Sequence, residues 1–165
     1  MRPPQHPVAV ALGSNLGDRA GHLAFAVKRL RQRLADLAVS PFIDTEPVGV
    51  SPQGRFLNGA VAGTWQGTAR ELIDYLGEVE GERGRDRPHP GAPRTLDLDL
   101  ILFGEDVIDE PGLVVPHPRF RERLFVLRPL AAISPDMIDP VTGLTVRELL
   151  ARASSGRAPS PKPKA

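Results

Sequence analysis

Residues 97–103 read DLDLILF, so that Asp97 and Asp99 alternate with leucines. This period of two predicts a β-strand that buries the leucines and presents both aspartates on the opposite face, roughly 7 Å apart. Two carboxylates at that spacing can share ions such as Mg²⁺, which keep substrate phosphates among their ligands. The alternative is a half-buried strand whose aspartates only face water. Asp is unfavourable in strands, and a functional site would explain that cost.

The composition fits one globular domain. The chain has 165 residues and 41% hydrophobic content, enough for a core, and we expect a single domain over 1–153 and a disordered Ser/Pro/Lys tail over 154–165. The net charge is +1 and the tail is basic, so the body is slightly acidic, which argues against nucleic-acid binding through a broad basic surface. Cysteine is absent, which excludes disulfides and thiolate metal sites. Without a membrane-spanning or secretory pattern, we expect a cytoplasmic monomer that contacts no membrane.

Strand and helix patterns alternate along the chain. Strands are predicted at 8–12, 38–44, 56–65 and 97–103, the second interrupted by Pro41 and therefore at an edge of the sheet. One helix is predicted over 19–37 and a second begins at Thr68. A third helical region ends at 130, and a last helix extends from Thr145 to 153; capping boxes begin the second and the last helix. Residues 104–106 should turn the aspartate strand into a hairpin with 107–109. Short connections favour a mostly antiparallel sheet with helices packed on its faces, an α+β class.

Five short motifs occur along the chain: 11–18 (ALGSNLGD), 56–61 (FLNGAV), 84–87 (GRDR), 93–99 (PRTLDLD) and 115–120 (VPHPRF). With them, residues 8–150 resemble the 6-hydroxymethyl-7,8-dihydropterin pyrophosphokinases of the folate pathway. The resemblance implies a ferredoxin-like α+β sandwich. It also implies transfer of pyrophosphate from the co-substrate ATP to a pterin hydroxymethyl group, with two Mg²⁺ ions and AMP as the second product.

The resemblance also implies a set of site residues. Asp97 and Asp99 would hold the metal ions. These two aspartates would form the catalytic group together with three arginines, Arg85, Arg87 and Arg94. The ATP contacts would be these arginines together with Glu80, His117 and Arg123. The pterin contacts would be Thr45, Val48, Phe56, Asn58 and Phe125. Metals and guanidiniums suit a transfer in which the protein positions reactants and neutralises charge, and a flat heterocycle needs aromatic faces and in-plane hydrogen-bond partners.

Other interpretations of these residues stay open. Glu80 could be a solvated helix carboxylate, His117 could cap a loop, and both phenylalanines could belong to the core. The chain departs from the family's pattern at Gly77 and Pro118, where relatives often carry glutamine and tyrosine, so the adenine contacts are not assigned. Paired aspartates on an antiparallel sheet also serve two-metal nucleotidyltransferases, which release pyrophosphate. An RNA-recognition module is disfavoured, because the body is acidic and no basic-aromatic strand is visible.

Overall fold

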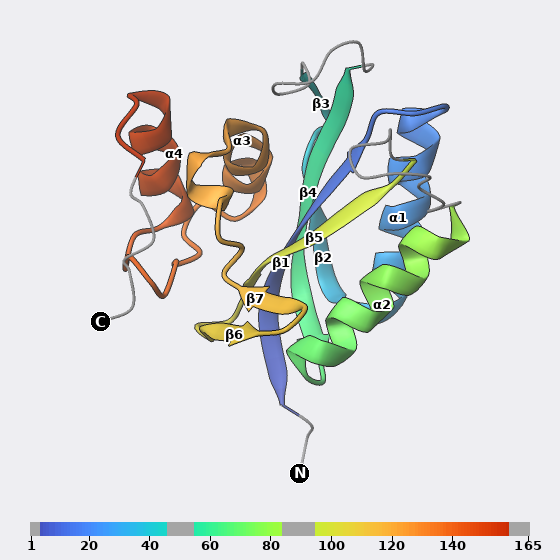
Figure 1. Cartoon of the computed structure of the whole chain (residues 1–165), viewed down its shortest axis with the longest axis horizontal. Helices are drawn as coiled ribbons and strands as arrows, with labels where there is room; N and C mark the ends of the chain where they lie inside the picture. The colour runs from blue at the N-terminus through green and yellow to red at the C-terminus, as the bar shows by residue number, and fades with distance from the viewer. Residues whose placement is uncertain (1–3, 46–54, 84–94, 159–165) are drawn as a thin grey trace.

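The computed structural model describes residues 4–45, 55–83 and 95–158, and their centre is an antiparallel sheet (Figure 1). Its order is β2-β4-β1-β5, with β3 pairing β4, and every pairing is antiparallel. This confirms the α+β class and the antiparallel sheet. The strands are β1 (Gln5–Ser14), β2 (Ala35–Val39), β3 (Ile43–Thr45), β4 (Phe56–Gln66) and β5 (Asp97–Phe103). The helices are α1 (Arg19–Arg33), α2 (Ala69–Glu82), α3 (Leu124–Ile133) and α4 (Val146–Ser154), with a 3₁₀ turn η1 (Phe120–Glu122) before α3.

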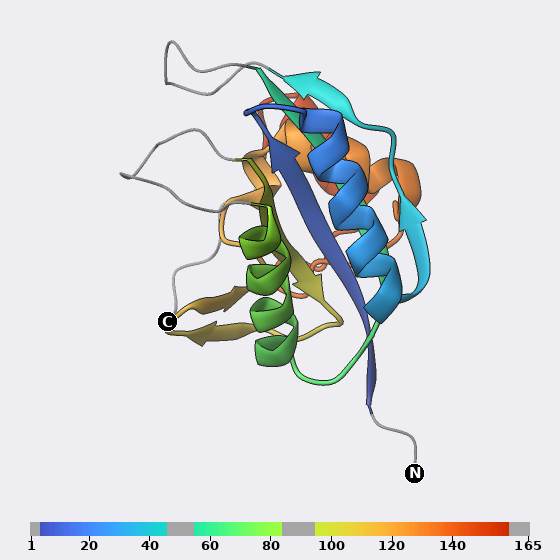
Figure 2. The ribbon, with the colours of Figure 1, turned by 90° about the vertical axis from the view of Figure 1, so that its right-hand side faces the viewer.

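Helices cover both faces of the sheet (Figures 1 and 2). The first two lie on one face, and α3 with α4 lies on the other. The central strand β1 separates two hydrophobic cores, because Val10 and Leu12 pack with α1 and α2 while Ala9 and Ala11 pack on the α3 side. Among the described residues, no helix is long and apolar enough to cross a membrane.

The first helix ends earlier than its apolar spacing predicts. We expected it to continue to residue 37, but α1 ends at Arg33 and Leu34 has an extended backbone (φ −104°, ψ 128°). Leu34 is buried and Leu37 is half-buried against the same core. The prediction was wrong because Leu34, at the end of the helix, and Leu37, in the following strand, continue the helical spacing by coincidence although neither is helical. The predicted strand over 38–44 is in fact two strands, β2 and β3, and β2 lies at the edge of the sheet, as Pro41 indicated.

The hairpin after β5 has a different partner from the one we expected. Instead of pairing with β5, β6 (Ile108–Glu110) pairs with β7 (Leu113–Val115) in a separate two-stranded sheet. The missed signal was Pro111-Gly112, since Gly112 turns the chain with a φ of 74°. After β7, the His117 N–H donates to the carbonyl of Ile101 at 3.0 Å. The hairpin therefore brings the chain back to the edge of β5.

Both predicted capping boxes are present. The Thr68 hydroxyl accepts from the Glu71 N–H at 3.1 Å and the Glu71 carboxylate accepts from the Thr68 N–H at 2.9 Å. Thr145 and Glu148 repeat the arrangement at 3.2 and 3.1 Å. The last helix ends at Ser154, one residue beyond the predicted end. Most of the expected tail, residues 159–165, lies outside the described residues.

Candidate active site

Gly13 lies at the middle of a row of residues that crosses three strands. It pairs with Asn58 of β4 on one side and with Asp97 of β5 on the other. Residues in one row of a sheet present their side chains to the same face, so the Asn58 amide and the Asp97 carboxylate flank bare backbone. A Cβ atom at Gly13 would lie only 3.1 Å from Asn58 Oδ1. The next row on this face has the small residue Ala11 opposite Asp99.

Asp97 and Asp99 lie on the α3 side of β5, and both are half-buried. Leu98 and Leu100 face the opposite core, as the alternation predicted. Within the described residues, no group of three His, Cys, Asp or Glu is placed to hold a metal ion. The two aspartates would therefore supply two carboxylate ligands and leave the other positions to substrate and water. Mg²⁺ is commonly bound in this way, so the donor chemistry fits that ion.

Glu80 of α2 is buried, with 7% of its surface exposed, and its carboxylate accepts a 2.8 Å hydrogen bond from the Leu98 N–H. The interpretation of Glu80 as a solvated carboxylate was therefore wrong. Leu98 lies between the two aspartates, so this bond connects α2 to the part of β5 that carries them. The ATP contact predicted for Glu80 stays a prediction.

The bond between Glu80 and Leu98 can be tested by two substitutions. Glu80→Ala removes an acceptor from a buried N–H and should lower the free energy of unfolding by about 1–3 kcal/mol. Glu80→Gln keeps an amide oxygen in place and should cost less. Urea unfolding with an unchanged m-value measures both losses. Equal losses in the two variants would contradict the hydrogen bond as their source.

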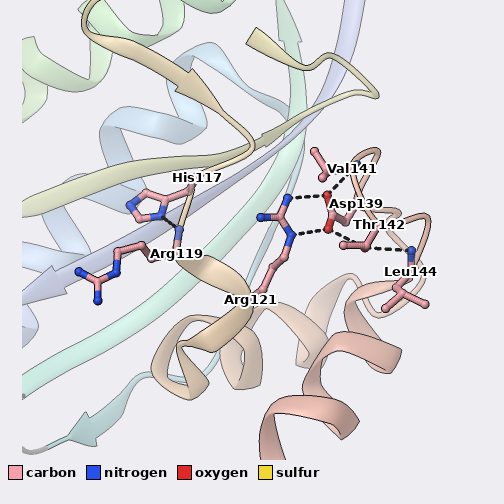
Figure 3. A network of polar contacts seen from close by, with 7 residues as sticks. All are labelled: His117, Arg119, Arg121, Asp139, Val141, Thr142 and Leu144. Carbon is pink, nitrogen blue, oxygen red and sulfur yellow. Dashed lines mark hydrogen bonds and ion pairs between the residues drawn. The ribbon is translucent and has the colours of Figure 1, made fainter. Parts of the chain in front are cut away.

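His117 lies near Asp97 and Arg123 in an environment that keeps its ring neutral. Burial, together with the positive charge of Arg123, lowers the pKa of His117 to about 4, although the carboxylate of Asp97 opposes this shift. The ring Nδ1 accepts from the Arg119 N–H at 3.2 Å (Figure 3). The proton of the neutral ring therefore lies on Nε2, which is a hydrogen-bond donor. The interpretation that His117 caps a loop is confirmed, since Nδ1 accepts this bond. The Nε2–H group can then donate to a ligand oxygen.

The neutral state of His117 has a measurable consequence. Because its pKa is about 4 in the folded protein and 6.5 ordinarily, the unfolded chain binds more protons between these values. Stability should therefore fall as the pH decreases from 6.5 towards 4. An NMR titration of the ring protons checks the pKa, and His117→Gln should remove this part of the pH dependence. A ring that titrates near 6.5 would contradict the assignment.

The predicted pterin residues come from three elements on the α3 side of the sheet. Asn58 is buried, and its Nδ2 donates to the Thr45 hydroxyl of β3 at 2.6 Å. Phe56 lies two residues before Asn58 on β4 and is half-buried. α3 packs on β4 and β3, and its first turn carries Phe125, whose ring lies 5.6 Å from the Arg123 guanidinium. Phe125 also contacts the α3-side core, so the core interpretation holds for part of its surface.

Four predicted site residues lie outside the described residues: Val48, Arg85, Arg87 and Arg94. Their roles stay predictions. A cavity of about 630 Å³ is lined by Pro7, Gly63 and Met137 among others. It lies near the start of β1 and the end of β4, whereas Gly13 and Asn58 lie at the other ends of these strands. None of the predicted site residues lines it. We therefore define the candidate site by the rows of residues around Gly13 and not by this cavity.

The sequence analysis missed a buried ion pair beside the site. Arg121 of η1 and Asp139 of the turn before α4 are 2% and 0% exposed, and Figure 3 shows the two side chains facing each other, on the side of the segment away from the His117 ring. Asp139 begins a turn in which its carboxylate accepts from the Val141 N–H at 3.0 Å. The DPVTG sequence of this turn was a readable signal for the Asp139 conformation. No pattern in the sequence pointed to Arg121 as its partner.

Comparisons with known proteins are consistent with this geometry. Residues 9–135 match the family described as 7,8-dihydro-6-hydroxymethylpterin-pyrophosphokinase (HPPK). The 2-amino-4-hydroxy-6-hydroxymethyldihydropteridine pyrophosphokinase of Bacillus subtilis is 46% identical over 126 residues, which cover 75% of each chain. The enzyme of the same name from Pseudomonas aeruginosa is 43% identical over 147 residues, covering 87% of this chain and 90% of that protein.

A solved structure agrees with the fold. A triple mutant of the HPPK-DHPS protein of Plasmodium falciparum, solved with pteroate, superposes with a TM-score of 0.70 at 12% identity, over 93% of this chain and 44% of that one. At this identity the likeness concerns the fold alone. The family match and the two bacterial relatives carry the assignment: the chain belongs to the 7,8-dihydro-6-hydroxymethylpterin-pyrophosphokinase family.

Proposed function

We propose that the sheet surface around Gly13 carries out the reaction of this family. A family member is an ATP-dependent pyrophosphokinase of folate biosynthesis, which transfers pyrophosphate from ATP to the hydroxymethyl group of 6-hydroxymethyl-7,8-dihydropterin. The observation that carries the proposal is the row that joins Asn58, Gly13 and Asp97. The row sets the Asn58 amide, for which we propose a contact with the heterocycle, beside the Asp97 carboxylate, for which we propose a contact with the metal; Gly13, which has no side chain, separates them.

Each group in the site has a chemical task in this proposal. Asn58 would hydrogen-bond the edge of the pterin, held by its bond to Thr45, while Phe56 and Phe125 cover the ring faces. His117, neutral at pH 7, would donate from Nε2 to a phosphate oxygen, and Arg123 would neutralise phosphate charge. We assign the same task to Arg85, Arg87 and Arg94. Mg²⁺ on Asp97 and Asp99, two ions in this proposal, would polarise the phosphoryl oxygens.

The finer description of the fold belongs to the same proposal. The order β2-β4-β1-β5, with α1 and α2 each connecting a pair of strands on one face, supports a ferredoxin-like arrangement extended by α3 and α4. The two-metal nucleotidyltransferase alternative is not favoured, since the family match covers both the Asn58 and the Asp97 strands. We also propose that the protein acts as a monomer on small molecules.

One incubation tests the function. Purified protein is mixed with ATP, Mg²⁺ and 6-hydroxymethyl-7,8-dihydropterin, and the nucleotides are separated by chromatography. AMP that forms only when both pterin and metal are present is the expected result. ADP would instead indicate ordinary phosphoryl transfer, and free pyrophosphate would indicate nucleotidyl transfer. Either product in place of AMP would overturn the proposal.

A further inference from the structure

Arg121 and Asp139 form a bidentate ion pair that is closed to solvent. Arg121 Nε donates to Asp139 Oδ2 at 2.6 Å and a terminal guanidinium nitrogen donates to Oδ1 at 3.0 Å. Only 2% and 0% of the two side chains are exposed. Such a pair fixes both the distance and the plane of the guanidinium, and burial protects it from screening by salt.

The Asp139 side of the pair is held in place by its own turn (Figure 3). Its carboxylate also accepts from the Val141 N–H at 3.0 Å and from the Thr142 hydroxyl at 2.7 Å. The same hydroxyl accepts from the Leu144 N–H at 3.2 Å. The turn therefore presents a carboxylate of fixed orientation, with two oxygens set for Arg121.

The Arg121 side belongs to the segment that carries two proposed phosphate contacts. His117 lies four residues before Arg121, and Arg123 lies two residues after it. Bonds within the segment set its local shape: the Arg119 N–H donates to the ring of His117, and the Arg123 N–H donates to the Phe120 carbonyl at 3.1 Å. The Phe120 ring is fully buried, but an apolar contact is not directional. The ion pair supplies the directional tie to the turn before α4.

We infer that Arg121 and Asp139 are a positioning pair, which sets the orientation of residues 117–123 so that His117 and Arg123 meet the nucleotide phosphates. The inference rests on the proposed roles of His117 and Arg123. A pair that served stability alone could be replaced by apolar side chains of similar volume at little cost. A positioning pair could not be replaced in this way, since apolar side chains keep the contact and lose the fixed orientation.

The test is the double variant Arg121→Met/Asp139→Leu, compared with the wild type by circular dichroism, urea unfolding and steady-state kinetics. We expect a folded protein whose KM for MgATP rises at least about tenfold, because small misplacements of binding groups have large kinetic effects. The KM for the pterin should stay unchanged. Arg147→Met/Asp136→Leu is the matched control, since that pair has the same residue types at 3.0 Å but is 65% and 79% exposed. The control should leave both constants unchanged.

A folded double variant with the wild-type KM for MgATP would overturn the inference. If the double variant does not fold, Asp139→Asn takes its place: this variant keeps the shape of the side chain and removes its charge, and the same rise in KM is expected. His117→Gln and Arg123→Met separate this inference from the proposal on which it rests. If the wild type forms AMP and neither variant raises the KM for MgATP, the proposed phosphate contacts are wrong and the inference fails with them. If His117→Gln and Arg123→Met both raise the KM for MgATP and the Arg121/Asp139 variants do not, only the positioning role is refuted.

Discussion

Replacing both Asp97 and Asp99 with asparagine should lower kcat/KM by at least about a thousandfold while the protein stays folded. Asparagine keeps the size and the strand geometry of each position, but a neutral amide binds Mg²⁺ poorly. Metal ions contribute several kcal/mol to transition states of this kind, and each 1.36 kcal/mol corresponds to a factor of ten. AMP formation at varied ATP concentrations, followed across a Mg²⁺ titration, measures the loss.

The design separates a metal site from a pair of solvated aspartates. The wild type should lose activity on chelation of Mg²⁺ and regain it when the ion is restored, and the double variant should respond to neither step. Asp109→Asn/Glu110→Gln on β6 is the matched control, because these acidic side chains are exposed and lie away from the rows of residues around Gly13. An active Asp97→Asn/Asp99→Asn variant would show that the alternating aspartates only face water.

Asp139→Ala should lower the free energy of unfolding by about 3–5 kcal/mol, because it leaves the buried Arg121 charge without its partner. A loss of this size is a large fraction of the roughly 5–15 kcal/mol that stabilises most domains. Chemical unfolding at pH 7 measures it. The apolar double variant Arg121→Met/Asp139→Leu should recover most of the stability, since it removes both charges together. A loss below about 1 kcal/mol would be typical of an exposed pair and would contradict the observed burial.

The difference in unfolding free energy between the wild type and Asp139→Ala should depend on pH in a definite direction. Burial by itself raises the pKa of Asp139, but hydrogen bonds from Arg121, Thr142 and Val141 together hold that pKa below its ordinary value of 3.8. The unfolded chain therefore binds the proton first as the pH falls. The stability contributed by Asp139 is present above about pH 4 and decreases below it. Unfolding free energies of the wild type and Asp139→Ala should converge in that acid range, and a difference that grows there would contradict the assignment.

Part of the fold and of the candidate site could be predicted from the sequence because the signals are local. The alternation at Asp97 and Asp99 settles which face of β5 carries them, and the capping boxes at Thr68 and Thr145 mark where two helices begin. The end of α1 could not be predicted in this way. Leu34 continues the apolar spacing of the helix, yet it is buried from extended backbone, and periodicity alone does not distinguish these two ways of reaching a core.

The sequence by itself determined most of the elements, the acidic face of β5 and the family to which the motifs pointed, since each depends on residues that are near neighbours along the chain. Only the tertiary structure decided which distant residues meet. The register of three strands sets Gly13 between Asn58 and Asp97, and folding joins Glu80 to Leu98 and Arg121 to Asp139 across 18 residues each. Periodicity reports which side of an element is buried, but the partner across a core depends on packing between elements. That packing has no local signature in the chain.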